Sequence, residues 1–213
     1  MAKRLGMVID TKRCIGCTTC AVACKGENNL PDKTWYNRVL TVGGANPNTP
    51  TGVYPHLTIE TITLACQHCE KPACLDVCPV GAISKSADGV ILQDNTPGSP
   101  TRCVGNRACI AACPYTGVRV FNFDEPTYQV QGFVLGGEGV PEHTLNKVEK
   151  CQFCAHRLAG GLEPACVEVC PSRARTFGDL NDPTSEVSRL LAARHSFTLL
   201  PEEGTEPSVH FLD

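Results

Sequence analysis

The sequence predicts an α+β fold of short helices and strands joined by many turns. Four cysteine groups recur along the 213 residues, and in each group the last two cysteines are spaced C-x3-C. Residues three or four apart share a helix face, so this spacing predicts a short helix in every group. Segments of alternating polar and apolar residues follow the groups and predict strands. The 16 prolines, the 19 glycines and an aromatic content of 6% predict many loops and a thin apolar core.

The predicted helices cover residues 18–26, 73–78, 108–113 and 165–170. Pro79, Pro114 and Pro171 follow three of the four groups directly and would end those helices. Gly26 is a candidate C-cap for the first helix. A further helix is predicted at 185–195, ahead of a tail rich in proline and glutamate.

Three strand regions are predicted between the groups. Residues 57–64 alternate with a phase slip at Glu60-Thr61, which predicts a β-bulge. Residues 83–92 read as a hairpin that turns around Asp88-Gly89, and residues 118–123 read as a single strand. The segments 31–54 and 126–144 are predicted to be inserted loops.

Composition and charge exclude several classes of protein. The net charge is −3 and no basic run is present, so nucleic acid is not an expected partner. No segment approaches the roughly 20 apolar residues of a transmembrane helix. The first ten residues lack the apolar region of a secretory signal. We therefore expect membrane attachment or export to depend on a partner chain.

The cysteine pattern favours iron–sulfur clusters over the two other common uses of cysteine. A disulfide scaffold is disfavoured by the odd count of 15 and by cysteines only two or three residues apart. Zinc sites usually have two C-x2-C pairs separated by a spacer, which these groups do not match. Sixteen thiolates would hold four cubane clusters, and in ferredoxins the cysteine before proline binds a different cluster from its neighbours. Here Asn106 stands where a sixteenth cysteine is expected.

Several motifs make the likeness more specific. They are Met7-Val8-Ile9-Asp10, Cys66-Gln67-His68-Cys69, Ala112-Cys113-Pro114-Tyr115 and Lys150-Cys151-Gln152-Phe153-Cys154. With these motifs, the chain resembles the four-cluster ferredoxin-type iron–sulfur subunit of the dimethyl sulfoxide reductase family of molybdopterin oxidoreductases. That family also includes subunits of polysulfide, thiosulfate, tetrathionate and arsenate reductases.

The resemblance implies a double bacterial-ferredoxin-like fold. Residues 1–30 with 145–180 would form the first two-cluster module, and residues 55–125 would form the second. Residues 31–54 and 126–144 would be the inserted loops, and residues 181–213 a C-terminal extension that binds a partner. We favour partner contact for this extension because a short helix with a polar tail is marginal when isolated.

The resemblance also implies a ligand set for each cluster. The first is Cys14, Cys17, Cys20 and Cys170; the second is Cys24, Cys151, Cys154 and Cys166; the third is Cys66, Cys69, Cys74 and Cys113; the fourth is Cys78, Cys103 and Cys109 with Asn106 at its last corner. The implied cofactors are three [4Fe–4S] clusters and one unusual cluster.

The content of the Asn106 site has three alternatives. A neutral amide is a poor substitute for thiolate, so loss of one iron to give [3Fe–4S] is the favoured outcome. A [4Fe–4S] cluster with an oxygen ligand and an empty site are the other two. Arg102 and Arg107 lie beside the site in sequence and would raise its potential by stabilising the reduced cluster.

The function implied is electron relay within a respiratory complex. The first cluster would face a catalytic subunit that carries molybdopterin, and the last would face a quinone-reactive membrane subunit. The chain would lie peripherally on the prokaryotic cytoplasmic membrane through these partners, on the periplasmic or the cytoplasmic face, with no catalytic residues of its own. The alternatives are a free polyferredoxin carrier and an enzyme that uses an open iron at Asn106.

The histidines are given lesser roles. His68 and His156 lie beside cysteines, and we expect them to serve in packing or in hydrogen bonding to sulfur. His143, His195 and His210 are isolated and expected at the surface.

Overall fold

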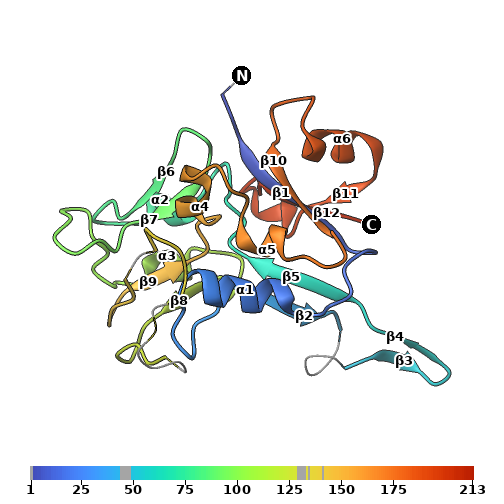
Figure 1. Cartoon of the computed structure of the whole chain (residues 1–213), viewed down its shortest axis with the longest axis horizontal. Helices are drawn as coiled ribbons and strands as arrows, with labels where there is room; N and C mark the ends of the chain where they lie inside the picture. Colours follow the sequence, from blue (N-terminus) through green and yellow to red (C-terminus); the bar gives the residue numbers. More distant parts are fainter. Residues whose placement is uncertain (1, 44–48, 129–132, 134, 141) are drawn as a thin grey trace.

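The structure is a computed structural model that describes residues 2–43, 49–128, 133, 135–140 and 142–213. Short helices and short strands are interspersed along the chain (Figure 1). The helices are α1 (Thr19–Glu27), α2 (Ala73–Asp76), α3 (Ala108–Ala111), α4 (Ala155–Ala159), α5 (Ala165–Glu168), α6 (Glu186–Ala193) and the 3₁₀ turn η1 (Pro201–Glu203). The strands are β1 (Leu5–Asp10), β2 (Asn37–Thr41), β3 (Thr51–Val53), β4 (His56–Thr58), β5 (Thr61–Ala65), β6 (Ile83–Lys85), β7 (Ile91–Gln93), β8 (Arg119–Phe121), β9 (Val148–Lys150), β10 (Arg175–Asp179), β11 (Ser196–Phe197) and β12 (Val209–Leu212).

The largest sheet joins the two ends of the chain. Its strand order is β10-β1-β12-β11, and every residue of β1 is buried. β1 pairs antiparallel with β10 and parallel with β12, so the first strand lies between segments from the last 40 residues (Figure 1). A central strand that is apolar on both faces needs cover on both sides. Helix α6 provides one cover, where Val187 packs on Val8 and Leu212.

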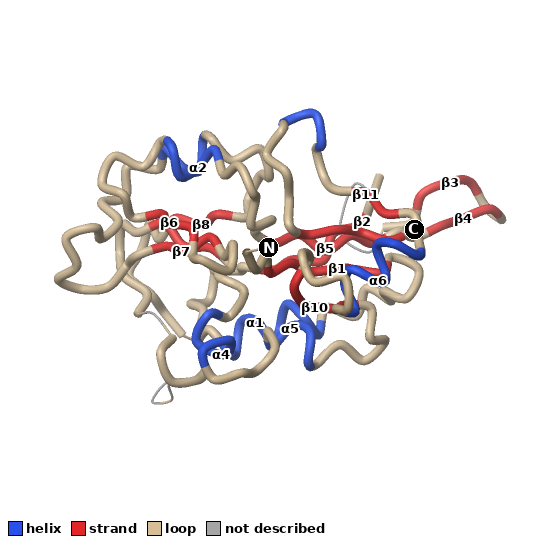
Figure 2. The backbone as a smooth tube through the Cα atoms, turned by 90° about the horizontal axis from the view of Figure 1, so that it is seen from above, coloured by secondary structure: helices blue, strands red, loops and turns tan. Residues whose placement is uncertain are grey.

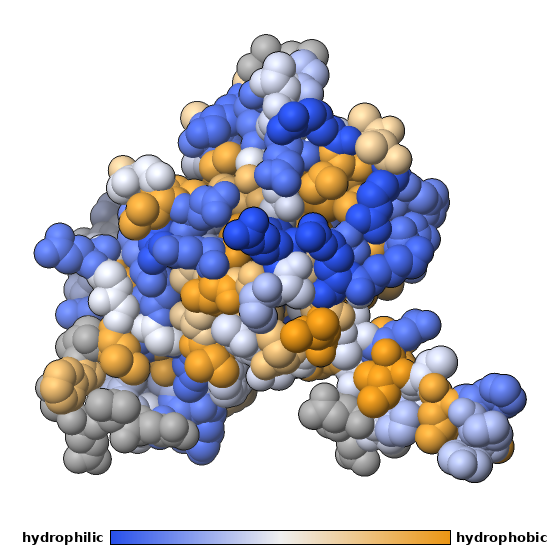
Figure 3. Space-filling model, turned by 45° about the vertical axis from the view of Figure 1, so that its right-hand side comes forward, coloured by the Kyte–Doolittle hydropathy of each residue, from blue (hydrophilic) through white to orange (hydrophobic). Residues whose placement is uncertain are grey.

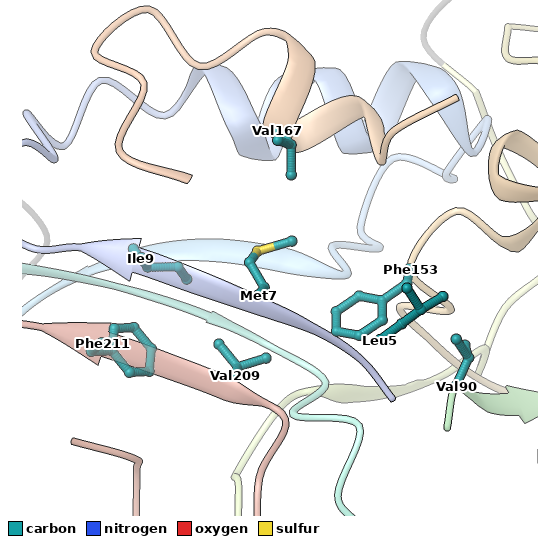
Figure 4. Packing of buried hydrophobic residues seen from close by; sticks show 8 residues of the cluster. All are labelled: Leu5, Met7, Ile9, Val90, Phe153, Val167, Val209 and Phe211. Carbon is teal, nitrogen blue, oxygen red and sulfur yellow. The ribbon is translucent and has the colours of Figure 1, made fainter. Parts of the chain in front are cut away.

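The opposite face of this sheet carries the main apolar core. Met7 and Ile9 from β1 pack with Val209 and Phe211 from β12. Figure 4 shows Val167 of α5 pointing down toward Met7 from the helix above the sheet. This packing holds α5 over the first strand, and α5 in turn contacts α1. In Figure 2 the strands form a middle layer, with α1, α4 and α5 on one side and α2 on the other.

The C-terminal segment is part of this core. Within residues 181–213, β12 lies between β1 and β11, and Phe211 and Leu212 are fully buried. Strand pairing and burial within the chain therefore stabilise this segment. Its expected role in binding a partner stays a prediction.

Four two-stranded sheets complete the fold of the described residues. They are β2-β5, β3-β4, β6-β7 and β8-β9, all antiparallel. The predicted hairpin at 83–92 is confirmed as β6 and β7, and the predicted strand at 118–123 as the shorter β8. The slip at Glu60-Thr61 marks the boundary between β4 and β5.

The four predicted cysteine helices are present as α1, α2, α3 and α5, and the predicted helix at 185–195 as α6. Helix α4 was not predicted. The expected loop at 31–54 was wrong in part, because it contains β2 and β3. The expected loop at 126–144 contains no helix or strand among its described residues, and its residues 129–132, 134 and 141 lie outside the described part of the chain. Among the helices that the structure describes, none has the length and apolar character to cross a bilayer.

Candidate iron–sulfur centres

All fifteen cysteines are free thiols, so the fold uses none of them as a disulfide. They lie in or near α1, α2, α3, α4 and α5, with Cys78, Cys113 and Cys170 just after a helix, and most are buried or half-buried. Cys17 is the exposed exception. Left-handed residues stand directly before three of these helices, at Thr18, Arg107 and Cys154. Such residues turn the chain sharply, so that a loop curls around the space that its cysteines face.

Cys24 at the end of α1 lies with three cysteines from the other end of the chain. Burial raises the pKa of the Cys24 thiol well above its usual value, and the nearby thiols of Cys151, Cys166 and Cys154 raise it further. These four residues line one enclosed cavity together with Cys66 and Arg175. The side-chain amide of Asn28 lies 3.7 Å from Cys24 Sγ and 4.0 Å from Cys154 Sγ. The structure therefore brings together the four cysteines expected at the second centre.

The cysteines expected at the first centre lie beside this group. Cys14, Cys20 and Cys170 are within electrostatic reach of the guanidinium of Arg175, and Cys17 is within reach of Cys170. The hydroxyl of Thr61 approaches Cys14 Sγ at 3.9 Å.

A third group surrounds Cys66. Burial raises the pKa of Cys69 to about 11, and Cys66 and Cys74 add to the increase. Burial likewise raises the pKa of Cys113 to about 11, again with Cys66 and Cys74 nearby. Four thiols whose ionised forms would repel one another need a shared positive centre, which iron supplies.

A fourth group lies in a separate apolar cluster. Cys103 and Cys109 are buried there with Ile83 and Ile91, and Cys78 packs against them. Asn106 is exposed, and its side-chain oxygen accepts a hydrogen bond of 3.3 Å from the backbone N–H of Ala108 at the start of α3. The structure thus gives the amide a local role in its loop.

The donor set fits iron–sulfur clusters. Thiolate is the ligand that proteins use for such clusters, and these thiols are free and gathered in groups. Within the part of the chain that the structure describes, no three His, Cys, Asp or Glu side chains come close enough to bind a single metal ion.

The two histidines beside the cysteines have partners other than sulfur. His68 is fully buried and stacks on Phe153 with a centroid distance of 3.6 Å. Its Nδ1 accepts a hydrogen bond from the N–H of Ile91, and burial lowers its pKa well below the usual value. His156 Nε2 lies 2.8 Å from a carboxylate oxygen of Glu27.

The surface assignment of His143 is wrong. Its side chain is buried, with Nδ1 2.7 Å from Glu149 Oε2 and Nε2 2.8 Å from the carbonyl oxygen of Asn28. The contact with Asn28 crosses more than one hundred residues of sequence, so no local pattern indicated it. His210 is half-buried, and His195 is exposed as expected.

The two arginines beside Asn106 have other partners. The guanidinium of Arg107 lies over the rings of Phe121 and Phe123, at 5.2 and 5.7 Å from their centroids. Arg102 donates to the carbonyl of Asn95 and to the hydroxyl of Thr144. Their expected effect on the cluster stays a prediction. Sequence reasoning missed three other cations, Arg119, Lys150 and Arg175, which are buried beside the cysteines.

A family model described as a 4Fe-4S dicluster domain matches residues 57–131 and 140–180. The chain is 45% identical over 214 residues to a proposed iron–sulfur subunit of dimethyl sulfoxide reductase from Halobacterium salinarum, covering 98% of this chain and 78% of that protein. It is 38% identical over 238 residues to the iron–sulfur subunit of the arsenate respiratory reductase of Shewanella sp. strain ANA-3, covering 98% and 96%.

A third relative is the iron–sulfur cluster-binding subunit of the menaquinone reductase of Nitratidesulfovibrio vulgaris, which is 35% identical, with 97% of this chain and 88% of that protein covered. These relatives align along almost the whole chain, including all four cysteine groups. The chain therefore belongs to the family of iron–sulfur subunits of the dimethyl sulfoxide and arsenate reductase type of molybdopterin oxidoreductases.

Proposed function

We propose that this chain relays single electrons through four iron–sulfur centres, between a molybdopterin-bearing catalytic subunit and a quinone-reactive membrane subunit. The observation that carries the proposal is the gathering of Cys24 with Cys151, Cys154 and Cys166, which lie more than 120 residues away in sequence. A single local loop could serve a structural metal, whereas interleaved groups along one chain suit a series of redox sites. When bound, the clusters would supply one-electron redox chemistry.

The proposed ligand sets are the four expected from the sequence. The first three centres would each hold [4Fe–4S] on four cysteines. The fourth would hold [3Fe–4S] on Cys78, Cys103 and Cys109, with Asn106 at the open corner. Residues 1–30 with 145–180 and residues 55–125 would then be the two modules of a double ferredoxin-like fold. The contacts of β1 with β10 and of α1 with α5 support the first module.

In the proposed series of electron-transfer centres, the first centre would face the catalytic subunit. Cys17 is exposed there, and so is its neighbour Ile15, at 69%. The β3-β4 hairpin projects from the body of the molecule and carries apolar side chains on its surface (Figure 3). Val53 and Leu57 of this hairpin are 80% and 49% exposed. Apolar side chains that lie together and are exposed to solvent are typical of a surface that binds a partner.

The other end is proposed to face the membrane subunit. Asn106 and Val104 are exposed in the loop of the fourth group, and Phe123, whose ring centroid lies 5.7 Å from the guanidinium of Arg107, is 67% exposed. The name of the menaquinone reductase relative supports a quinone-reactive neighbour. We propose that the chain lies peripherally on the membrane through these two partners.

The test is to purify the chain with its genetically linked catalytic subunit and to follow the clusters by EPR. Reduced methyl viologen should reduce the clusters. Dimethyl sulfoxide, arsenate, selenate and tetrathionate are then added in turn. We expect only one of these electron acceptors to reoxidise the clusters. A chain that elutes alone from size exclusion and is reoxidised by no acceptor would instead support the free carrier.

A further inference from the structure

Three lysine or arginine side chains are buried in the described part of the chain. Arg119, Lys150 and Arg175 are 5%, 1% and 7% exposed. Among the described residues, no carboxylate forms an ion pair with any of the three. Burying an unpaired charge costs several kcal/mol, so a fold that buries three must compensate them in another way.

The buried acids do not provide the compensation. Asp10 pairs with Arg194, and Glu149 pairs with His143. Glu149 also accepts hydrogen bonds from Tyr36 and Asn122. Each buried carboxylate therefore already has its own partners.

The hydrogen-bond acceptors of the three cations are mostly neutral. Lys150 donates to the backbone carbonyls of Ile91 and Cys151. Arg119 donates to the side-chain oxygen of Gln93 at 3.3 Å, and its Nη2 has no hydrogen-bond partner among the described residues. Neutral acceptors orient a cation but do not cancel its charge.

Arg175 is oriented in a similar way. It donates to Asn37 Oδ1 at 3.3 Å and approaches Met7 Sδ at 3.2 Å. Its Nη1 also lies 3.7 Å from the sulfur of Cys166, which is the one acceptor of the set that can ionise. The cation thus points at a predicted cluster ligand.

Two of the cations face each other across one pair of strands. Arg119 of β8 is in register with Lys150 of β9. Like charges directly opposite on neighbouring strands are destabilising, and more so when both are buried. An anion beside each side chain would remove this conflict.

The thiols around each cation belong to two successive groups. Arg175 is within electrostatic reach of Cys166, from the second proposed ligand set, and of Cys14, Cys20 and Cys170, from the first. Lys150 is within reach of Cys66 and Cys74 and of Cys151.

Arg119 likewise lies near thiols of two proposed ligand sets. It is within electrostatic reach of Cys74, Cys66 and Cys113, from the third proposed ligand set, and of Cys109, from the fourth. In the proposed order of centres, the three cations fall between the first and second, the second and third, and the third and fourth.

We propose that Arg175, Lys150 and Arg119 are fixed counter-charges of the electron path, one in each interval between successive centres. This inference rests on the proposed function and its ligand sets. A cation between two centres stabilises an extra electron on either side, so it raises the reduction potential of both neighbours. The buried thiolates and iron–sulfur groups are in turn the anions that the three cations lack.

The test is an EPR-monitored redox titration of the full chain loaded with clusters. The variants are Arg175→Met, Lys150→Met and Arg119→Met, because methionine keeps an unbranched stem and removes the charge. We expect each variant to lower the reduction equilibrium constant of two centres about tenfold, which is 59 mV for a one-electron couple. Lys150→Met should shift one centre that also responds to Arg175→Met and another that also responds to Arg119→Met.

The controls distinguish the effect of a buried charge on the reduction potentials from the effect of an exposed charge and from that of side-chain shape. Arg173→Met removes an exposed cation close to Cys170, and we expect no shift because solvent and salt screen it. Arg119→Lys and Arg175→Lys keep the charge and should keep the wild-type potentials. Lysine variants that shift as far as the methionine variants would overturn the inference.

The remaining outcomes are also decisive. No shift in any centre, or the same shift in all four, contradicts the interval assignment. If a methionine variant loads less iron, recovery of iron in the matching variant that keeps the charge (Arg119→Lys, Lys150→Arg or Arg175→Lys) supports the role of charge, and failure to recover overturns it. A wild-type chain that binds no clusters would instead refute the proposed function itself.

Discussion

Asn106 occupies a loop that is constrained on both sides. Gly105 has φ +77°, and a Cβ there would lie 2.2 Å from the carbonyl oxygen of Asn146. Arg107 is also left-handed, at φ 62°. Between them, the Asn106 side chain accepts a hydrogen bond from Ala108 N. A short polar side chain therefore suits the loop, while the missing thiolate changes what the loop can bind.

Replacing Asn106 with cysteine should complete the fourth ligand set. We expect Asn106→Cys to convert [3Fe–4S] to [4Fe–4S], which adds about one iron per chain and removes the EPR signal of the oxidised [3Fe–4S] cluster. The control is Asn106→Ser, which keeps a short acceptor for Ala108 N and should keep the signal. Four intact [4Fe–4S] clusters in the wild-type chain by Mössbauer spectroscopy would contradict the assignment.

His143 is expected to be a buried cation with its own carboxylate. A carbonyl and a carboxylate can only accept, so both ring nitrogens of His143 donate, to Asn28 and to Glu149. Burial by itself would lower the pKa of His143, but the hydrogen bond and charge of Glu149 outweigh it, and the net pKa is raised above 6.5. The folded state therefore holds this proton more tightly than the unfolded state.

This difference predicts a pH-dependent contribution to stability. The contribution is fully present below the unfolded pKa of 6.5 and is lost as the pH rises through the higher folded pKa. We expect His143→Gln to cost roughly 2 kcal/mol of unfolding free energy at about pH 6 and less at about pH 9. Denaturant titrations of both proteins at the two pH values measure it. A cost that grows with pH would contradict the assignment.

Strand β12 connects the end of the chain to its beginning. Phe211 is fully buried and stacks on Phe197 of β11 with a centroid distance of 5.4 Å. It also belongs to the core that Met7 and Ile9 form below α5 (Figure 4). The strand therefore supports the element that carries Cys166 and leads to Cys170.

Truncation of Phe211 should weaken this support. We expect Phe211→Ala to lower the unfolding free energy by roughly 3–5 kcal/mol and to speed the loss of clusters, because it leaves a cavity under α5. Denaturant unfolding and the bleaching of visible absorbance check this. Phe133→Ala, at a side chain that is 73% exposed, is the control and should change neither.

The β3-β4 hairpin is predicted to bind the catalytic subunit. Val53→Ser with Leu57→Ser removes exposed apolar surface, so we expect the variant to load its clusters normally but to co-purify with less catalytic subunit. Val104→Ser removes an apolar side chain that is 57% exposed in the loop of the fourth group, and it should leave co-purification unchanged. Equal retention in both variants would exclude the hairpin from the interface.

Across the full chain, the clusters are expected to be part of the core. The apolar packing is divided among several small groups, and cysteines take part in most of them. The three buried cations add a cost that only the clusters would offset. The folded state should therefore depend on iron more than on apolar burial alone.

Removal of iron should unfold much of the chain. We expect a chelator under reducing conditions to cause loss of circular dichroism and rapid proteolysis, and iron with sulfide to restore both. An apoprotein that keeps the spectrum and the protease resistance of the loaded chain would contradict this. The same measurement on Lys150→Met tests whether the unpaired cation contributes to the instability.

Local patterns in the sequence were enough to predict the ligand type, the cysteine helices and one hairpin. The C-x3-C spacing predicts helices because it acts within one turn, and the hairpin of β6 and β7 follows from a turn only a few residues long. Asn106 was visible as the odd member of a repeat. These features are determined by residues that are close together in the sequence, so a local sequence pattern can predict them.

The long-range contacts and the burial of charge became apparent only in the folded chain. The insertion of β12 beside β1 joins segments about 200 residues apart, and strand pairing at that distance leaves no local pattern. His143 was misplaced for the same reason. Arg119, Lys150 and Arg175 read as ordinary cations in the sequence, because only packing shows that water is excluded from them and that thiols of two groups surround each one.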